Sequence, residues 1–125
     1  TPKKFVEDGL NEGKDIILEI EVMGAMKIKE QYPDALLIFI SAPSIEVLKE
    51  RLRGRGTEPE EVIIKRLKEA TEEAADMDKY DYIVINDDLE ECIKTVDSII
   101  VSYACRTENN KEFIKQIRDD LKGIW

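Results

Sequence analysis

The stretch RLRGRGTEPEEVIIKR, residues 51–66, organises the rest of this chain. Gly54 and Gly56 interrupt a helical pattern and give the backbone freedom on either side of Arg55. A second helical pattern begins near Pro59. The sequence therefore predicts two helices joined by a mobile loop that carries positive charge.

The arginines around this break suit an anion clamp. The candidate residues are Arg51, Arg55 and Arg66. A guanidinium stays charged near neutral pH and offers a rigid fork of donors that matches phosphate oxygens. From composition alone, solvated arginines with weak surface ion pairs are the commoner alternative, and the partners at hand are Glu58, Glu60 and Glu61. The choice between the two interpretations depends on the rest of the chain.

Composition limits the class of protein. A chain of 125 residues with 42% hydrophobic residues suits one globular domain. The net charge of −9, from 19 Lys+Arg against 28 Asp+Glu, argues against nucleic acid as a partner but allows an anionic ligand where cations gather. No apolar run approaches the roughly 20 residues that span a bilayer, and no signal-peptide pattern opens the chain. We therefore expect a cytoplasmic protein with no membrane partner.

Histidine and cysteine usage excludes several kinds of chemistry. Cys92 and Cys105 fall in one predicted helix, roughly 20 Å apart at a rise of ~1.5 Å per residue, which is too far for a disulfide. We expect free thiols in a reducing compartment. The chain has no histidine, so histidine catalysis and histidine metal sites are excluded, and two distant cysteines form no zinc site. We predict no metal site built from protein ligands alone.

Short apolar runs alternate with amphipathic helical patterns. We predict strands at residues 15–20, 36–40 and 82–85, each followed by a helix. Two further helices are expected at the ends of the chain, one capped by Thr1 and Pro2 and one after residues 107–110. This alternation favours an α/β fold with a parallel sheet and helices on both faces. About three strands leave both sheet edges open, so we expect a partial domain with further chain before Thr1.

Two carboxylates, Glu19 and Glu21, lie at the end of the first predicted strand, on the same side as Ile17. A carboxylate at the end of a buried strand is costly unless a cation or a metal ion meets it. The alternative is that both side chains lie past the sheet edge in water. The residues themselves leave these two interpretations open.

Two phrases, SAPSIEVLKERLRGRGTEPEEVIIKRL at residues 41–67 and IVINDDL at residues 83–89, at their mutual spacing, resemble bacterial guanylate kinases. The resemblance runs from Thr1 to about Tyr103 and corresponds to the C-terminal half to two thirds of such an enzyme. The P-loop of type GxxGxGKS and much of the GMP-binding region are absent from these 125 residues. The resemblance implies a P-loop NTPase-like fold, with a partial kinase core at residues 1–106, a lid at residues 52–78 inside it, and a C-terminal helical extension at residues 107–125.

The resemblance also implies binding roles for the acceptor side. Thr1 matches a hydroxyl residue that contacts the guanine base. Glu19 and Glu21 match an acidic pair at the end of the strand beside the P-loop strand, with Glu21 between the two nucleotide sites near the magnesium waters. Met23 departs from the pattern, because the family usually has glutamine there, and this puts a hydrogen bond from that side chain in doubt.

On the donor side, the resemblance assigns the arginines to the lid. Arg51, Arg55 and Arg66 match catalytic lid arginines that fold over the ATP phosphates. Asn86 matches a residue after the last strand that lies near the adenine of ATP, although Asn86, Asp87 and Asp88 also make an adequate helix cap.

The resemblance implies that the complete protein phosphorylates GMP to GDP with ATP and Mg²⁺, and that residues 1–125 alone have little activity. Two other classes stay open: a non-catalytic guanylate-kinase-like binding module, and a kinase for another nucleoside monophosphate. The tail is open as well, since its apolar residues can cover exposed sheet, form a homodimer or hold another partner. These residues are Phe113, Ile114, Ile117 and Trp125.

Overall fold

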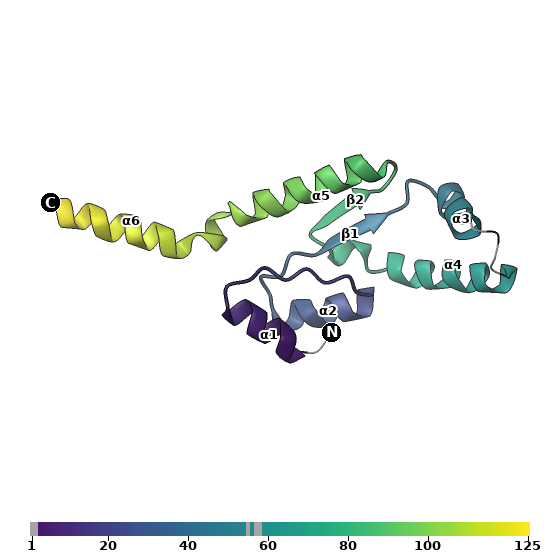
Figure 1. Cartoon of the computed structure of the whole chain (residues 1–125), viewed down its shortest axis with the longest axis horizontal. Helices are drawn as coiled ribbons and strands as arrows, with labels where there is room; N and C mark the ends of the chain where they lie inside the picture. Colours follow the sequence, from purple (N-terminus) through teal and green to yellow (C-terminus); the bar gives the residue numbers. More distant parts are fainter. Residues whose placement is uncertain (1–2, 55, 57–58) are drawn as a thin grey trace. The chain divides into compact units, whose positions relative to one another are not determined.

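The computed structural model describes residues 3–54, 56 and 59–125 (Figure 1). Thr1, Pro2, Arg55 and Glu58, to which we assigned a helix cap, a lid cation and an ion-pair partner, lie outside the described residues. The chain divides into two compact units, Thr1–Ala35 and Leu36–Trp125. Within the described ranges, no helix combines the length and the apolar character needed to cross a lipid bilayer.

The first unit holds helices α1 (Lys3–Asn11) and α2 (Val22–Gln31), joined by an extended segment. Helix α1 ends shortly before Gly13, which has a positive φ of 78° and whose N–H donates to the carbonyl of Leu10 at 3.0 Å. Val6 of α1 and Val22 of α2 are both 7% exposed and belong to the small core of this unit.

The prediction of a strand at residues 15–20 is wrong. The segment is extended, but it has no ladder partner among the described residues. Neighbouring side chains of the segment still point to opposite sides. Ile16 packs so closely on α1 that a Cβ on Gly9 would lie 2.7 Å from Ile16 Cδ1, whereas Ile17 is 84% exposed. A strand exists only through backbone hydrogen bonds to a neighbour. The P-loop strand that the resemblance places beside this segment is not in the sequence.

The second unit is built on a parallel pair of strands, β1 (Ile38–Ser41) and β2 (Tyr82–Ile85), which confirms the expected α/β class. The register pairs Ile38 with Tyr82 and Ser41 with Ile85. Asp81 fixes the start of the ladder, because its Oδ2 accepts from Leu37 N at 2.8 Å while its own N–H donates to Leu37 O at 2.9 Å. The two strands predicted at residues 36–40 and 82–85 are confirmed, the first with its boundaries shifted by one or two residues.

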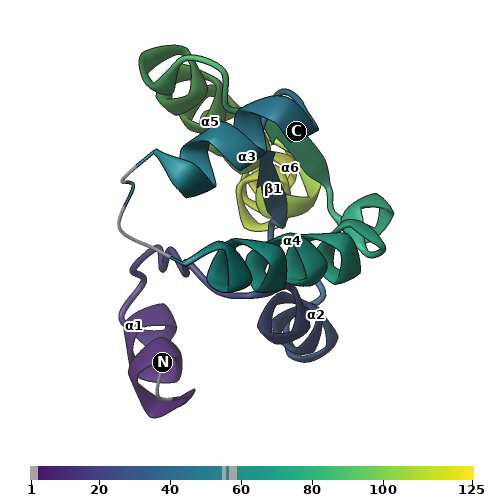
Figure 2. The ribbon, with the colours of Figure 1, turned by 90° about the vertical axis from the view of Figure 1, so that its right-hand side faces the viewer.

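Four helices accompany this sheet. They are α3 (Ile45–Arg53), α4 (Glu60–Ala74), α5 (Leu89–Ala104) and α6 (Lys111–Ile124), with short 3-10 helices η1 (Met77–Lys79) and η2 (Thr107–Asn109). Ser44 caps α3, since its Oγ accepts from Val47 N at 3.2 Å. Helices α3 and α4 lie side by side (Figure 2), and α5 packs on β2.

The apolar core of the second unit is small. Among the described residues of this unit, the buried apolar side chains are Leu37, Ile63, Val84 and Cys92. Apolar side chains of the sheet remain exposed, such as Ile40 at 53% and Ile85 at 62%. Cys92 and Cys105 are both free thiols, as expected.

Candidate functional site

The break between α3 and α4 has the backbone geometry that its glycines predict. Gly54 follows the last residue of α3 in a helical conformation, and Gly56 has a positive φ of 63°, which L side chains rarely adopt. The N–H of Gly56 donates to the carbonyl of Arg53 at 2.8 Å. On the other side, Val62 N donates to Pro59 O at 3.0 Å and starts α4. Both ends of the break are therefore tied to their helices.

Arg51 reaches from α3 to the loop that follows β2. Its Nη2 donates to the carbonyl of Asp87 at 3.3 Å, although the two residues are 36 positions apart in the chain. Asn86 precedes Asp87, is half-buried, and continues the ladder by donating its N–H to Ser41 O at 2.7 Å. The structure thus brings together Arg51 and the Asn86 loop, two of the features predicted for the ATP side.

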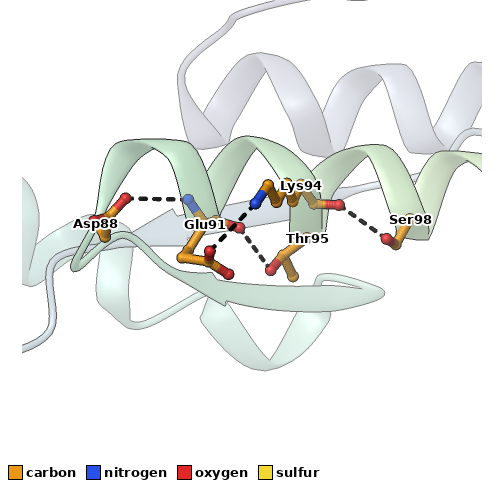
Figure 3. A network of polar contacts seen from close by, with 5 residues as sticks. All are labelled: Asp88, Glu91, Lys94, Thr95 and Ser98. Atoms are coloured by element: carbon orange, nitrogen blue, oxygen red, sulfur yellow. Dashed lines mark hydrogen bonds and ion pairs between the residues drawn. The ribbon is translucent and has the colours of Figure 1, made fainter.

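The end of the Asn86 loop is anchored by the start of α5 (Figure 3). Asp88 Oδ1 accepts from Glu91 N at 3.2 Å, which confirms the predicted cap. Glu91 pairs with Lys94 at 3.5 Å and accepts from Thr95 Oγ1 through its carbonyl at 2.9 Å, and Ser98 Oγ donates to Lys94 O at 2.9 Å. Asn86 is therefore held between a strand ladder and a capped helix, which fixes its backbone position.

The structure describes one of the other two arginines predicted for a lid. Arg66 lies on the exposed side of α4, so the structure places two of the three predicted arginines, Arg51 and Arg66, on adjacent helices. Arg55 lies outside the described residues.

The acidic pair belongs to the first unit. Glu19 and Glu21 are exposed, and within the described part of the chain neither makes an ion pair. Glu21 stands at the N-cap position of α2, where its carbonyl accepts from Ala25 N at 2.9 Å. The partial positive charge at a helix N-terminus favours a carboxylate at this place. Met23 in the first turn of α2 is 73% exposed, and its thioether side chain has no N–H to donate.

No cluster of three or more metal-ligating side chains occurs in the described part of the chain. The first unit has an open cavity of about 330 Å³ between α1, the extended segment and α2. Its lining includes Val6, Leu18, Ile20 and Ile28 and excludes Glu19 and Glu21, so it is separate from the predicted acidic site.

The sequence interpretation missed one ion pair at the break between α3 and α4. Arg53, which was not among the candidate residues, donates from Nη2 to Glu60 Oε1 at 2.7 Å. This is the ion-pair alternative considered for the arginines, and it is realised at a neighbouring position. The sequence contains a signal for this ion pair. An arginine in the last turn of one predicted helix and a glutamate in the first turn of the next are separated only by a short break.

Two groups with raised pKa values, Lys79 and Tyr80, lie between α4 and β2. Burial raises the pKa of Tyr80, and the negative charges of Glu73 and Asp76 raise it further. The pKa of Lys79 is raised by its hydrogen bond with Asp76 and by the charge of that carboxylate, whose Oδ1 lies 2.8 Å from Lys79 Nζ. Tyr80 also packs edge-on against Phe39 of β1, with ring centroids 5.1 Å apart. The aromatic contact therefore links the segment after η1 to strand β1.

The family model for guanylate kinase matches residues 1–103. The chain belongs to the guanylate kinase family. The resemblance stated from the lid phrase and the IVINDDL phrase is thereby confirmed, with the span that it was given.

Curated guanylate kinases from several bacteria are similar to the chain. The guanylate kinase of Caldanaerobacter subterraneus subsp. tengcongensis is 47% identical over 120 residues, which are 96% of this chain and 58% of that protein. That of Bacillus cereus is 45% identical over 121 residues, with 97% and 59% covered, and that of Carboxydothermus hydrogenoformans is 47% identical over 102 residues, with 82% and 50% covered. The chain thus spans 50% to 59% of the length of these guanylate kinases. The longer alignments continue past residue 103 into the tail.

Proposed function

We propose that this chain is part of an enzyme that transfers the γ-phosphoryl group of ATP to GMP and forms GDP. The observation that supports it most directly is the hydrogen bond from Arg51 to the carbonyl of Asp87. In a chain of the guanylate kinase family, this bond brings a lid arginine to the loop of Asn86, the residue expected near the adenine.

The chemistry explains why arginines lie on a hinged element. Transfer between two nucleotides brings polyanions together through a transition state whose charge is spread over the equatorial phosphoryl oxygens. Arg51, Arg55 and Arg66 neutralise this charge when the lid, residues 52–78, closes over the phosphates and excludes water. The acceptor is already an anionic phosphate, so no histidine or other general base is required.

The acceptor site is proposed on the first unit. Thr1 contacts the guanine base through its hydroxyl, and Glu19 and Glu21 lie toward the acceptor nucleotide. Both carboxylates are exposed and make no ion pair with the described residues, so they are accessible to ligand. Their charge also disfavours a misplaced phosphate, since like charges repel.

Mg²⁺ enters this proposal as the companion of ATP. Exposed carboxylate oxygens such as that of Glu21 are suitable partners for the water shell of a hard cation. When bound, the ion supplies charge neutralisation on the phosphates. The residues of this chain orient the water molecules around Mg²⁺ and the nucleotide. We place the reaction in the cytoplasm.

The test is an acceptor comparison on the complete protein. With ATP and Mg²⁺, we expect rapid ADP formation with GMP and little with AMP, CMP or UMP. Similar rates with another monophosphate would instead identify a kinase for that nucleotide. Absence of transfer with every acceptor, together with retained peptide binding, would support the non-catalytic module. We expect residues 1–125 alone to be inactive, because nothing in them cradles the β-phosphate as a P-loop does.

A further inference from the structure

The ion pair between Arg53 and Glu60 joins two helix ends. Arg53 is the last residue of α3 and Glu60 is the first residue of α4, and Arg53 Nη2 lies 2.7 Å from Glu60 Oε1. The charges match the helix dipoles, because a cation is favoured at a C-terminus and an anion at an N-terminus. The same two groups therefore stabilise their own helices and bridge the break between them.

The two helices carry two of the arginines that we propose bind the ATP phosphates. Arg51 lies two residues before Arg53 on α3, and Arg66 lies six residues after Glu60 on α4. Because an α-helix is stiff over one or two turns, fixing the end of each helix limits where these two guanidinium groups can move. Arg51 is also bonded to the Asp87 carbonyl, so α3 is held at the sheet while the ion pair holds α4 to α3.

We propose that the Arg53–Glu60 ion pair is a lid latch that positions Arg51 relative to Arg66 before ATP binds. The inference rests on the proposed kinase function, since only that function gives the two arginines a common ligand. Arg53 and Glu60 are positioning residues here. They act through the arginines on either side of the break.

The latch is weak enough to open during each catalytic cycle. Its side chains are 51% and 59% exposed, so water and salt screen the attraction. Loss of such an exposed pair changes an equilibrium by roughly two- to five-fold. Without the latch, ATP must order α3 and α4 by itself. We therefore expect a higher KM for ATP and an unchanged KM for GMP.

The kinetic test compares Glu60→Gln with Glu61→Gln in the complete protein. Glu61 lies in the same first turn of α4 and loses the same charge, but among the described residues it makes no ion pair, so it is the matched control. We expect Glu60→Gln to raise the KM for ATP about two- to five-fold and Glu61→Gln to change it less than 1.5-fold. The ratio for Glu60→Gln should shrink toward one at about 0.5 M NaCl, where the Debye length falls to a few ångströms. Equal effects of the two substitutions would overturn the latch.

A double-mutant cycle tests whether Arg53 and Glu60 act through each other. Arg53→Gln combined with Glu60→Gln should raise the KM for ATP no further than either change alone. Effects that multiply would show two independent roles and would overturn the proposal.

A second readout does not need catalysis. In the ligand-free protein, hydrogen exchange at the amides of Val62 and Ile63, which bond to Pro59 O, should be faster in Glu60→Gln than in Glu61→Gln. Equal exchange in the two variants would refute the latch whatever the kinetics. If the unmodified protein has no kinase activity, the proposed function fails and the positioning of Arg51 and Arg66 for ATP fails with it, whereas equal exchange in an active protein overturns the latch alone.

Discussion

Replacing Asp81 by alanine should destabilise the second unit measurably, because this side chain holds the first rung between β1 and β2. Asp81 Oδ2 accepts from Leu37 N at 2.8 Å, and Leu37 is only 6% exposed. Without the carboxylate, the Leu37 amide loses a charge-assisted acceptor at a place where water has poor access.

The size of the stability loss follows from the charge of the Asp81 carboxylate and from its exposure to water. A hydrogen bond to a charged acceptor contributes roughly 1.5–3 kcal/mol, and an exposed carboxylate such as that of Asp81 keeps part of its hydration. We therefore expect Asp81→Ala to lower the free energy of unfolding by ~2 kcal/mol. Asp81→Asn keeps an oxygen at the same place and loses only the charge, so its cost should be ~1 kcal/mol or less. Asp97→Ala, at an exposed position of α5, is the control and should stay within about 0.5 kcal/mol of the unmodified chain.

Urea unfolding followed by far-UV circular dichroism measures all three variants under identical conditions. The expected order of stability is unmodified chain and Asp97→Ala first, then Asp81→Asn, then Asp81→Ala. Two results would refute the reasoning: an Asp81→Ala variant as stable as the Asp97→Ala control, or an asparagine variant as unstable as the alanine variant. The second would show that the charge, not the acceptor, stabilises this end of the sheet.

Three further outcomes are expected. In the complete protein, Arg55→Gln or Arg66→Gln should lower kcat by about 10³- to 10⁵-fold in a coupled ADP assay, and less than a tenfold loss for both would contradict the clamp. The folded chain raises the pKa of Tyr80 and so binds its proton more tightly than the unfolded chain does. The stability that this proton contributes is present below pH ~10 and is lost as the pH rises further. Urea unfolding measured from pH 9 to 11.5 should therefore show a steeper fall in the free energy of unfolding for the unmodified chain than for Tyr80→Phe. Gly56→Ala should lower the free energy of unfolding by ~1 kcal/mol, because the φ of Gly56 is 63°. Gly123→Ala should raise it by about 0.5–1 kcal/mol, because the added Cβ meets open space in α6. Equal effects of the two substitutions would show that the backbone of Gly56 is not constrained.

Local signals predicted local structure well. The run at residues 82–85 forms β2 with the predicted bounds, and Asp88 caps the helix that it precedes. In each case, the residues that decide the outcome lie within a few positions of one another.

Features that depend on a distant partner could not be predicted in the same way. The segment at residues 15–20 has the alternation of a strand, but pairing requires a neighbouring strand, and pattern alone does not supply one. The bond from Arg51 to Asp87 joins residues that only the tertiary fold brings together. The sequence indicated which residue types suit phosphate binding, while the fold determines which of these residues lie close together.

The register of β1 and β2 determines where the loop of Asn86 and Asp87 lies relative to Arg51. Asp81 precedes β2 and Asn86 follows it, about 16 Å farther along at ~3.3 Å per residue. A slip of one residue between the strands would turn every side chain of β2 to the other face and would move the Asp87 carbonyl relative to Arg51. Asp81 opposes such a slip, because its carboxylate and its N–H both bond to Leu37 and so specify one register. Asp81 contributes to the proposed nucleotide site without touching it, and Asp81→Ala should therefore raise the KM for ATP in the complete protein as well as lower its stability.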